Sequence, residues 1–175
     1  MRYLLIFALL VLMAPLGWGE ETPESPESLV RGFYAAYFET RPTGLPTEAE
    51  LKILSPYFSS ELTALFVRAR KVQAEYRKRH PDDKPPLIEG DLFSSLFEGP
   101  TGFEVGPTEK MDQRYKVYVR FSRVDPRDPQ DVFRWEDAVI VRRQGNRFVI
   151  EDFEFLGHWP FKIGDHLSIV LRNME

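Results

Sequence analysis

Apolar residues follow a helical period over the first half of the chain. The first such stretch covers residues 26–41 and carries a wide apolar face. The centre of that face is Leu29, Phe33 and Tyr37. Ser25 before Pro26 predicts the start of this helix, because a serine hydroxyl caps free N–H groups and proline suits the first helical position. The Arg41-Pro42 pair predicts its end, because the residue before a proline avoids helical geometry.

Two further helices are expected before residue 81. Thr47 and Glu50 have the spacing of a capping box, so they predict a short helix that stops at Ser55-Pro56. A longer helix begins at Ser59 or Ser60 and ends near His80. Its buried face is marked by apolar residues at helical spacing: Leu62, Leu65, Phe66, Ala69, Val72 and Tyr76.

From residue 101 onward the period changes to two, which is typical of half-buried strands. Three strands are expected, over residues 115–121, 133–141 and 148–155. The loops at residues 125–131 and 144–146 are short and rich in turn residues. Such short connections predict that neighbouring strands pair antiparallel.

Helices first and antiparallel strands afterwards predict a single α+β domain over residues 26–175, with the N-terminal helices packed on a curved sheet. The tail after Asp165 is expected to form a short final helix rather than an edge strand. The domain is long enough to bury a real core without covalent links.

Residues 1–19 have the pattern of a secretory signal peptide, with the cut expected after Gly19. The apolar run from Leu4 to Met13 is ten residues long, which is too short for a helix that spans a bilayer. The alternative is an uncleaved anchor or a buried first element. Residues 20–25 predict a flexible lead. We therefore expect a periplasmic or secreted protein with no stable membrane anchor after cleavage.

The amino-acid composition excludes or disfavours several classes of function. The chain has no cysteine, which excludes disulfides, thiolate nucleophiles, cysteine zinc sites and a lipoprotein anchor. Its 27 acidic and 23 basic residues give a net charge of −4, which disfavours nucleic acid as a partner. Aromatic residues make up 14% of the chain, so rings must build much of the core or line a pocket.

Four segments carry a resemblance to a known family. They are the aromatic helix Leu29–Phe38, the phrase Leu54–Leu62, the stretch Ile88–Ser95 and the hairpin strand Arg147–Phe153. Together they look like an uncharacterised family of bacterial exported proteins within the nuclear-transport-factor-two-like superfamily. The resemblance implies a cone-shaped, cystatin-like roll in which helices line one side of a strongly bent sheet and leave a cavity at its wide end. Such folds host isomerases, dehydratases, transport adaptors and immunity proteins.

Two aspartates are the candidate catalytic acids. Asp91 lies beside Leu92 and Phe93, where loss of water would raise its pKa and suit it to act as a general base. The alternative is that Asp91 or Ser94 caps a short turn. Asp137 shares a strand face with Trp135, so it must lie at the cavity mouth or find a partner. The candidate partners are Arg120, Arg134 and Tyr118.

The remaining candidates concern ligands and metals. Tyr118 or Tyr76 would supply a hydroxyl donor, and Trp135, Tyr76 and Phe93 are the candidate ligand-binding residues. No histidine has a metal-binding spacing, and no cofactor fingerprint is present. The repeat at Asp125, Asp128 and Asp131 predicts a plain hairpin loop rather than a calcium site, because prolines interrupt it.

These patterns favour a non-enzymatic binding module for a partner protein or a small apolar or aromatic ligand. One alternative is an isomerase or dehydratase that uses Asp91 or Asp137 as its base. Another is an envelope immunity or inhibitor protein that inserts residues 125–131 into a toxin. Whether the protein forms a homodimer stays open.

Overall fold

The structure is a computed structural model that describes residues 25–159 and 162–175. The expected signal peptide and nearly all of the expected lead fall outside the described residues. The helices are α1 (Pro26–Thr40), α2 (Glu48–Leu54), the short 3₁₀ turn η1 (Ser55–Tyr57), α3 (Ser60–Arg79) and α4 (Leu167–Arg172). The strands are β1 (Gly102–Met111), β2 (Arg114–Asp125), β3 (Asp128–Gln144) and β4 (Arg147–Glu154).

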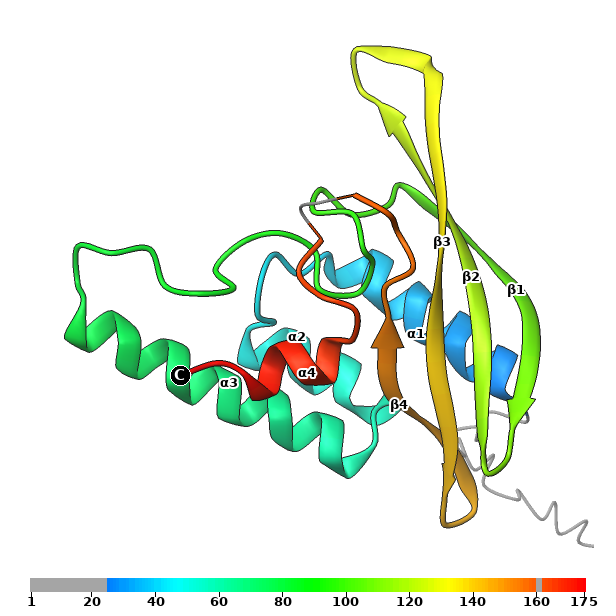
Figure 1. The fold of residues 1–175 in the computed structure, drawn as a ribbon, viewed down its shortest axis with the longest axis horizontal. Helices are drawn as coiled ribbons and strands as arrows, with labels where there is room; N and C mark the ends of the chain where they lie inside the picture. Colours follow the sequence, from blue (N-terminus) through cyan, green and yellow to red (C-terminus); the bar gives the residue numbers. More distant parts are fainter. Residues whose placement is uncertain (1–24, 160–161) are drawn as a thin grey trace, which may run out of the picture.

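The strands form one open antiparallel sheet in the order β1-β2-β3-β4, with the helices on one side of it (Figure 1). The expected α+β class is therefore confirmed. Sequence reasoning resolved β2, β3 and β4 but missed β1. Its register shifts between Val105 and Thr108, where Gly106 and Pro107 interrupt the alternation.

Residues 125–131 are mostly strand rather than the expected loop. β2 runs to Asp125 and β3 begins at Asp128, so only Pro126 and Arg127 lie between them. β3 tolerates Pro129 because a proline at a strand end removes no essential ladder bond. The resulting hairpin extends past the helices, at the top of Figure 1.

Local capping explains where the helices begin. The Ser25 hydroxyl accepts from the Ser28 N–H at the start of α1, and the Thr47 hydroxyl accepts from the Glu50 N–H at the start of α2. Ser59, rather than Ser60, caps α3. These starts and the short C-terminal helix α4 confirm the expectations from sequence.

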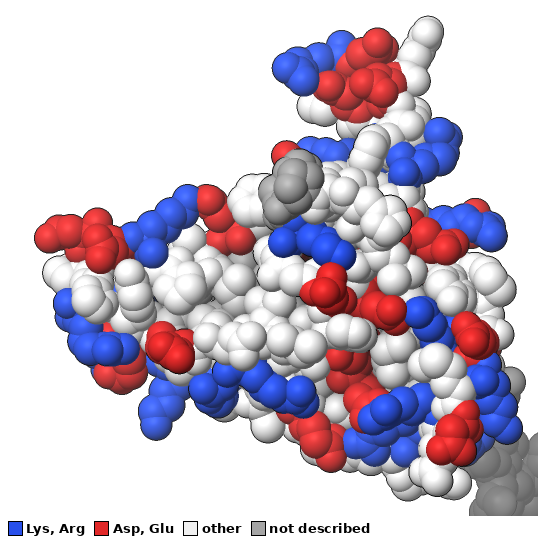
Figure 2. Space-filling model, viewed as in Figure 1, with Lys and Arg blue, Asp and Glu red and all other residues white. Residues whose placement is uncertain are grey.

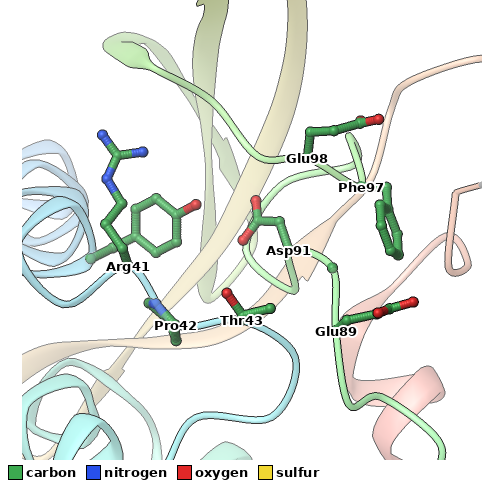
Figure 3. A pocket seen from close by; sticks show the side chains of 9 residues that line it. Arg41, Pro42, Thr43, Glu89, Asp91, Phe97 and Glu98 are labelled. Atoms are coloured by element: carbon green, nitrogen blue, oxygen red, sulfur yellow. The ribbon is translucent and has the colours of Figure 1, made fainter. Parts of the chain in front are cut away.

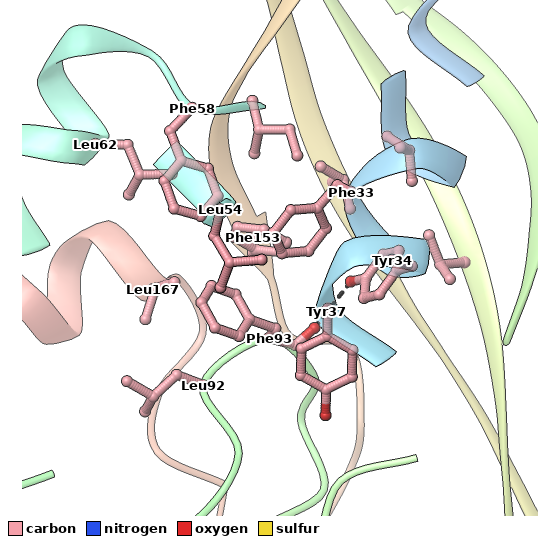
Figure 4. Packing of buried hydrophobic residues seen from close by; sticks show 14 of the residues in the cluster. Phe33, Tyr34, Tyr37, Leu54, Phe58, Leu62, Leu92, Phe93, Phe153 and Leu167 are labelled. Atoms are coloured by element: carbon pink, nitrogen blue, oxygen red, sulfur yellow. Dashed lines mark hydrogen bonds between the residues drawn. The ribbon is translucent and has the colours of Figure 1, made fainter. Parts of the chain in front are cut away.

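Aromatic rings fill the space between α1 and the sheet (Figure 4). Phe33 of α1 is fully buried, and its ring lies 5.1 Å from that of Phe153 on β4 and 5.3 Å from that of Phe93. Val117 and Val119 of β2 complete this face without exposure to solvent. The middle of the sheet is therefore packed against rings, as in an ordinary core.

A long connection, residues 80–101, joins α3 to β1 without a helix or strand of its own. Connections of this length are uncommon in compact domains and are usually either functional or linkers. Its second half enters the core, and the Tyr34 hydroxyl donates to the Phe93 carbonyl at 2.8 Å (Figure 4). The buried run is Asp91, Leu92, Phe93, Ser94, Ser95 and Leu96. We call residues 87–99 the core loop.

The outer face of the sheet is covered by paired charges (Figure 2). Lys116 pairs with Glu154 at 2.8 Å, and Arg120 lies 3.6 Å from both Glu104 and Glu136. Pairs of this kind suit a face in contact with water. Functional candidates therefore lie on the helical side of the sheet or at its ends.

Candidate functional site

A pocket of about 400 Å³ lies where the C-terminal end of α1 meets the core loop (Figure 3). Helix α1 ends here because Arg41 takes a left-handed backbone conformation, with φ 48°, and Pro42 follows it. The core loop is fastened to this turn, since the Gly44 N–H donates to the Gly90 carbonyl at 2.7 Å. The lining residues are Tyr37, Arg41, Pro42, Thr43, Glu89, Gly90, Asp91, Phe97 and Glu98.

Tyr37 and Asp91 meet at the buried side of this pocket. The Tyr37 hydroxyl hydrogen-bonds to the Asp91 carboxylate, which is only 6% exposed. Asp91 also accepts from the Phe93 N–H at 3.2 Å and from the Ser94 hydroxyl at 2.5 Å. The alternative that Asp91 caps a turn is therefore confirmed, and the carboxylate still lines a pocket.

Burial raises the pKa of Asp91 to about 6. Loss of water is the main cause, and the hydrogen bonds from Ser94, Phe93 and Tyr37 oppose it by stabilising the ionised form. The negative charge of Asp137 raises the pKa of Asp91 further. Burial, followed by the charge of Asp91, raises the pKa of Tyr37, which therefore stays a donor at neutral pH.

At the pocket mouth, a cationic side chain that is fixed in place lies beside exposed acidic residues and an exposed aromatic ring. The Arg41 guanidinium lies 4.0 Å from the centre of the Phe38 ring and donates to the Pro100 carbonyl at 2.7 Å. Glu98 forms no ion pair with a described side chain, and Phe97 is 42% exposed. The mouth therefore offers a free carboxylate beside an accessible aromatic face.

Two glycines allow the core loop to approach Tyr37. Gly90 has φ 85°, and a β-carbon there would lie 2.5 Å from the Phe97 ring. Gly99 has φ 69°, and a β-carbon there would lie 3.0 Å from the Tyr37 hydroxyl oxygen and 3.3 Å from the Asp91 β-carbon. Both positions favour glycine for its backbone conformation and for space.

Asp137 is buried by the alternation expected of β3, but its partners differ from those expected. Its carboxylate accepts from the Ser95 N–H at 2.7 Å, the Leu156 N–H at 2.8 Å and the Trp135 Nε1–H at 3.0 Å. The expected partner Arg120 instead pairs on the opposite face of the sheet. Three N–H donors compensate the buried charge, so Asp137 holds the core loop and the end of β4 to β3.

The two tyrosines expected to serve the candidate acids lie elsewhere. Tyr118 is on the outer face of β2, where its hydroxyl donates to Glu109 at 3.2 Å. Tyr76 packs against His80 near the end of α3, with ring centres 4.6 Å apart and the ring planes tilted by 35°. Sequence reasoning assigned Tyr37 to the core stripe of α1, and no local pattern links that stripe to Asp91.

The expected ligand-binding residues Trp135, Tyr76 and Phe93 do not line the pocket at Tyr37 and Asp91. Phe93 is 1% exposed and belongs to the ring core, so it offers no free surface in this conformation. Trp135 packs against Phe121 at 5.4 Å and Phe133 at 5.7 Å, while Tyr76 lies on α3. Their role as ligand contacts stays a prediction.

The described residues contain neither a metal-binding cluster nor a membrane-spanning helix. No group of three or more histidine, aspartate or glutamate residues among them could hold a metal ion. His166 faces Asp152 at 3.4 Å, and Asp125 pairs with Arg127 at 3.0 Å within the hairpin turn. Within residues 25–159 and 162–175, no helix has the length and apolarity needed to cross a bilayer.

No protein-family model matches the chain, and no curated protein is significantly similar to it.

Proposed function

We propose that this protein is an exported, non-enzymatic binding module whose pocket at Tyr37 and Asp91 takes a small ring-bearing amine. The assignment to the nuclear-transport-factor-two-like superfamily and the periplasmic or secreted location are part of the same proposal. The pocket carries it, because Asp91 is mostly ionised above its pKa of about 6 and Glu98 adds a second negative charge. An ammonium group fits these acids, and the exposed Phe97 ring suits the apolar part of such a ligand.

Binding is favoured over catalysis by how Asp91 is held. The Phe93 N–H binds one carboxylate oxygen and the Ser94 hydroxyl binds the other, while Tyr37 adds a third hydrogen bond. A general base needs a free oxygen within reach of the proton that it removes. The three internal donors fill most of the acceptor positions of the carboxylate and stabilise its ionised form, which suits attraction of an ammonium group better than removal of a substrate proton.

An enzyme of the isomerase or dehydratase type is the second candidate. Two observations favour it: the pKa of Asp91 lies near neutrality, and the Tyr37 hydroxyl could stabilise a developing negative charge. In this case Asp91 must exchange one internal hydrogen bond for a substrate proton. Turnover of a bound compound would favour this candidate, and binding without turnover would favour the module.

The proposal is tested with a panel of small ring-bearing primary amines, each matched to its neutral alcohol and its carboxylate. Ligand-observed NMR with the mature protein should detect the amines in preference to both counterparts. Glu98→Gln and Phe97→Ala should each weaken amine binding by roughly tenfold, which corresponds to about 1.4 kcal/mol. Glu104→Gln, which removes an exposed acid on the outer sheet face, is the matched control. Equal binding of all three chemical classes, or equal affinity in every variant, would refute the proposal.

A further inference from the structure

The β2–β3 hairpin presents a strand edge that its own sheet leaves open. β3 pairs with β2 at Asp128 and over residues 132–142, but its pairing with β4 begins only at Ala138. Where the register shifts, residues 129–131 have no partner on β2. Residues 128–134 of β3 thus have no strand on the β4 side. We call this stretch the free edge.

Several backbone groups along the free edge have no backbone partner. In the described part of the chain, no backbone–backbone hydrogen bond outside the β2–β3 ladder involves these residues. Within the edge itself, the Gln130 N–H donates to the Asp128 carboxylate at 3.0 Å and the Val132 carbonyl accepts from Arg134 at 3.5 Å. Six of the seven residues are exposed, among them Phe133 at 44%, and the exception is the half-buried Val132. The hairpin also projects beyond the helices, so no described helix covers it (Figure 1). An open edge of this kind is a template for another extended chain.

Side chains next to the free edge add an apolar contact. Phe133 points to the helical side of the sheet, where its ring lies 5.3 Å from that of Trp159. Beside it is a recess of about 480 Å³ between the hairpin and the core loop. Its lining is Leu96, Glu98, Arg123, Asp125, Pro126, Arg127, Asp131 and Phe133. A side chain of an added strand could cover the exposed part of Phe133 here.

The charges of the free edge indicate what kind of segment fits. Asp128 and Asp131 form no ion pair with a described side chain, whereas the nearby Arg127 is already paired with Asp125. Figure 2 shows acidic side chains gathered at the tip of the hairpin, with basic side chains beside them. Along the free edge the two aspartates outnumber its one basic residue, the exposed Arg134. A second copy of this chain, paired through the same edge, would bring the same acids together. A basic partner strand would place opposite charges across the ladder.

We propose that the free edge binds an extended, basic segment of a partner protein, which joins the sheet beside β3. Main-chain hydrogen bonds would provide most of the affinity, and contacts with Asp131 and Phe133 would select the sequence. The free edge itself lies outside the amine pocket, and only Glu98 lines both that pocket and the recess beside Phe133. The inference therefore goes beyond the proposed function and does not depend on it.

The test uses a displayed library of short random peptides, selected on the mature protein, and the best binder made synthetically. We expect that peptide to contain lysine or arginine alternating with apolar residues. On binding, it should slow hydrogen exchange at backbone amides of the free edge. A copy that is N-methylated at alternate residues should lose binding, because it cannot form the main-chain ladder.

Charge reversal then separates strand addition from general attraction to an acidic protein. Asp131→Lys should weaken the peptide by about tenfold, since it turns cross-strand attraction into repulsion. Asp82→Lys, at an exposed loop position far along the chain from the hairpin, makes the same change in net charge and should leave affinity unchanged. The proposal is overturned if no peptide is enriched, if protection lies elsewhere, or if both reversals have the same effect.

Discussion

The Tyr37 hydroxyl hydrogen-bonds to the buried carboxylate of Asp91, which joins the last turn of α1 to the core loop. This contact lies at the floor of the pocket that we propose as a ligand site. It also links three properties that can be measured separately: the pKa of Asp91, the stability of the domain and the shape of the pocket.

Removing the hydroxyl should raise the pKa of Asp91 above about 6, because the Tyr37 hydrogen bond stabilises the ionised carboxylate. The substitution is Tyr37→Phe, and NMR titration of the Asp91 side-chain carboxyl measures the effect. We also expect a loss of about 1–2 kcal/mol in the free energy of unfolding at neutral pH. Tyr118→Phe removes a hydroxyl from the outer sheet face and should leave the Asp91 titration unchanged.

Stability should fall as the pH rises from about 4 to about 6. The folded protein keeps the Asp91 proton up to a pKa of about 6, whereas the unfolded chain releases it near the ordinary aspartate pKa of 3.8. Between these values the folded state binds more protons, so the free energy of unfolding decreases with pH. The full contribution of this group is about 3 kcal/mol.

Asp91→Asn is the matched variant for this pH dependence, because asparagine has nearly the same shape and does not titrate. Urea unfolding at a series of pH values should show wild-type protein losing stability relative to the variant across this range. Parallel curves for the two proteins would contradict the raised pKa.

Replacing Asp137 should be among the most damaging changes at a polar position. Asp137→Ala leaves the Ser95 N–H, the Leu156 N–H and the Trp135 Nε1–H without their acceptor. We expect a loss of at least about 3 kcal/mol in the free energy of unfolding, since each buried donor left unpaired costs about 1–3 kcal/mol. Asp82→Ala, at an exposed position, should change the urea midpoint little.

Two glycine substitutions distinguish the cost of backbone strain from the effect of a new contact at the site. Gly99→Ala would add a β-carbon 3.0 Å from the Tyr37 hydroxyl oxygen at φ 69°, whereas Gly145→Ala has φ 63° and no atom within 4 Å of the new carbon. Each substitution should cost about 1–2 kcal/mol through its left-handed conformation. Only Gly99→Ala should also reduce amine binding, and urea unfolding with ligand-observed NMR tests both effects. Equal loss of binding in the two variants would contradict this view of the site.

Local patterns predicted most of the helices and strands but not the way in which the site assembles. The caps at Ser25, Thr47 and Ser59 depend on neighbours three residues away, so the sequence shows them directly. β1 was missed because Gly106 and Pro107 break its alternation. A pattern of period two cannot reveal a strand that bulges in its middle.

Asp137 and Asp91 also show what local sequence patterns can and cannot predict. Alternation along β3 predicted that Asp137 is buried, which the structure confirms. Its donors were not predicted, because Ser95 and Leu156 lie in irregular segments whose paths depend on tertiary packing. Tyr37 was likewise assigned to the core, since nothing local to α1 indicates that the core loop brings Asp91 to its hydroxyl.

The proposed function requires that the pocket at Tyr37 and Asp91 bind a small organic cation. The most direct measurement is the NMR titration of the Asp91 carboxyl with and without a saturating ring-bearing amine from the panel. A bound ammonium group near the carboxylate favours its ionised form, so the account predicts that the pKa of Asp91 falls below about 6 when the amine is present. An Asp91 titration that is identical with and without the amine would contradict the account.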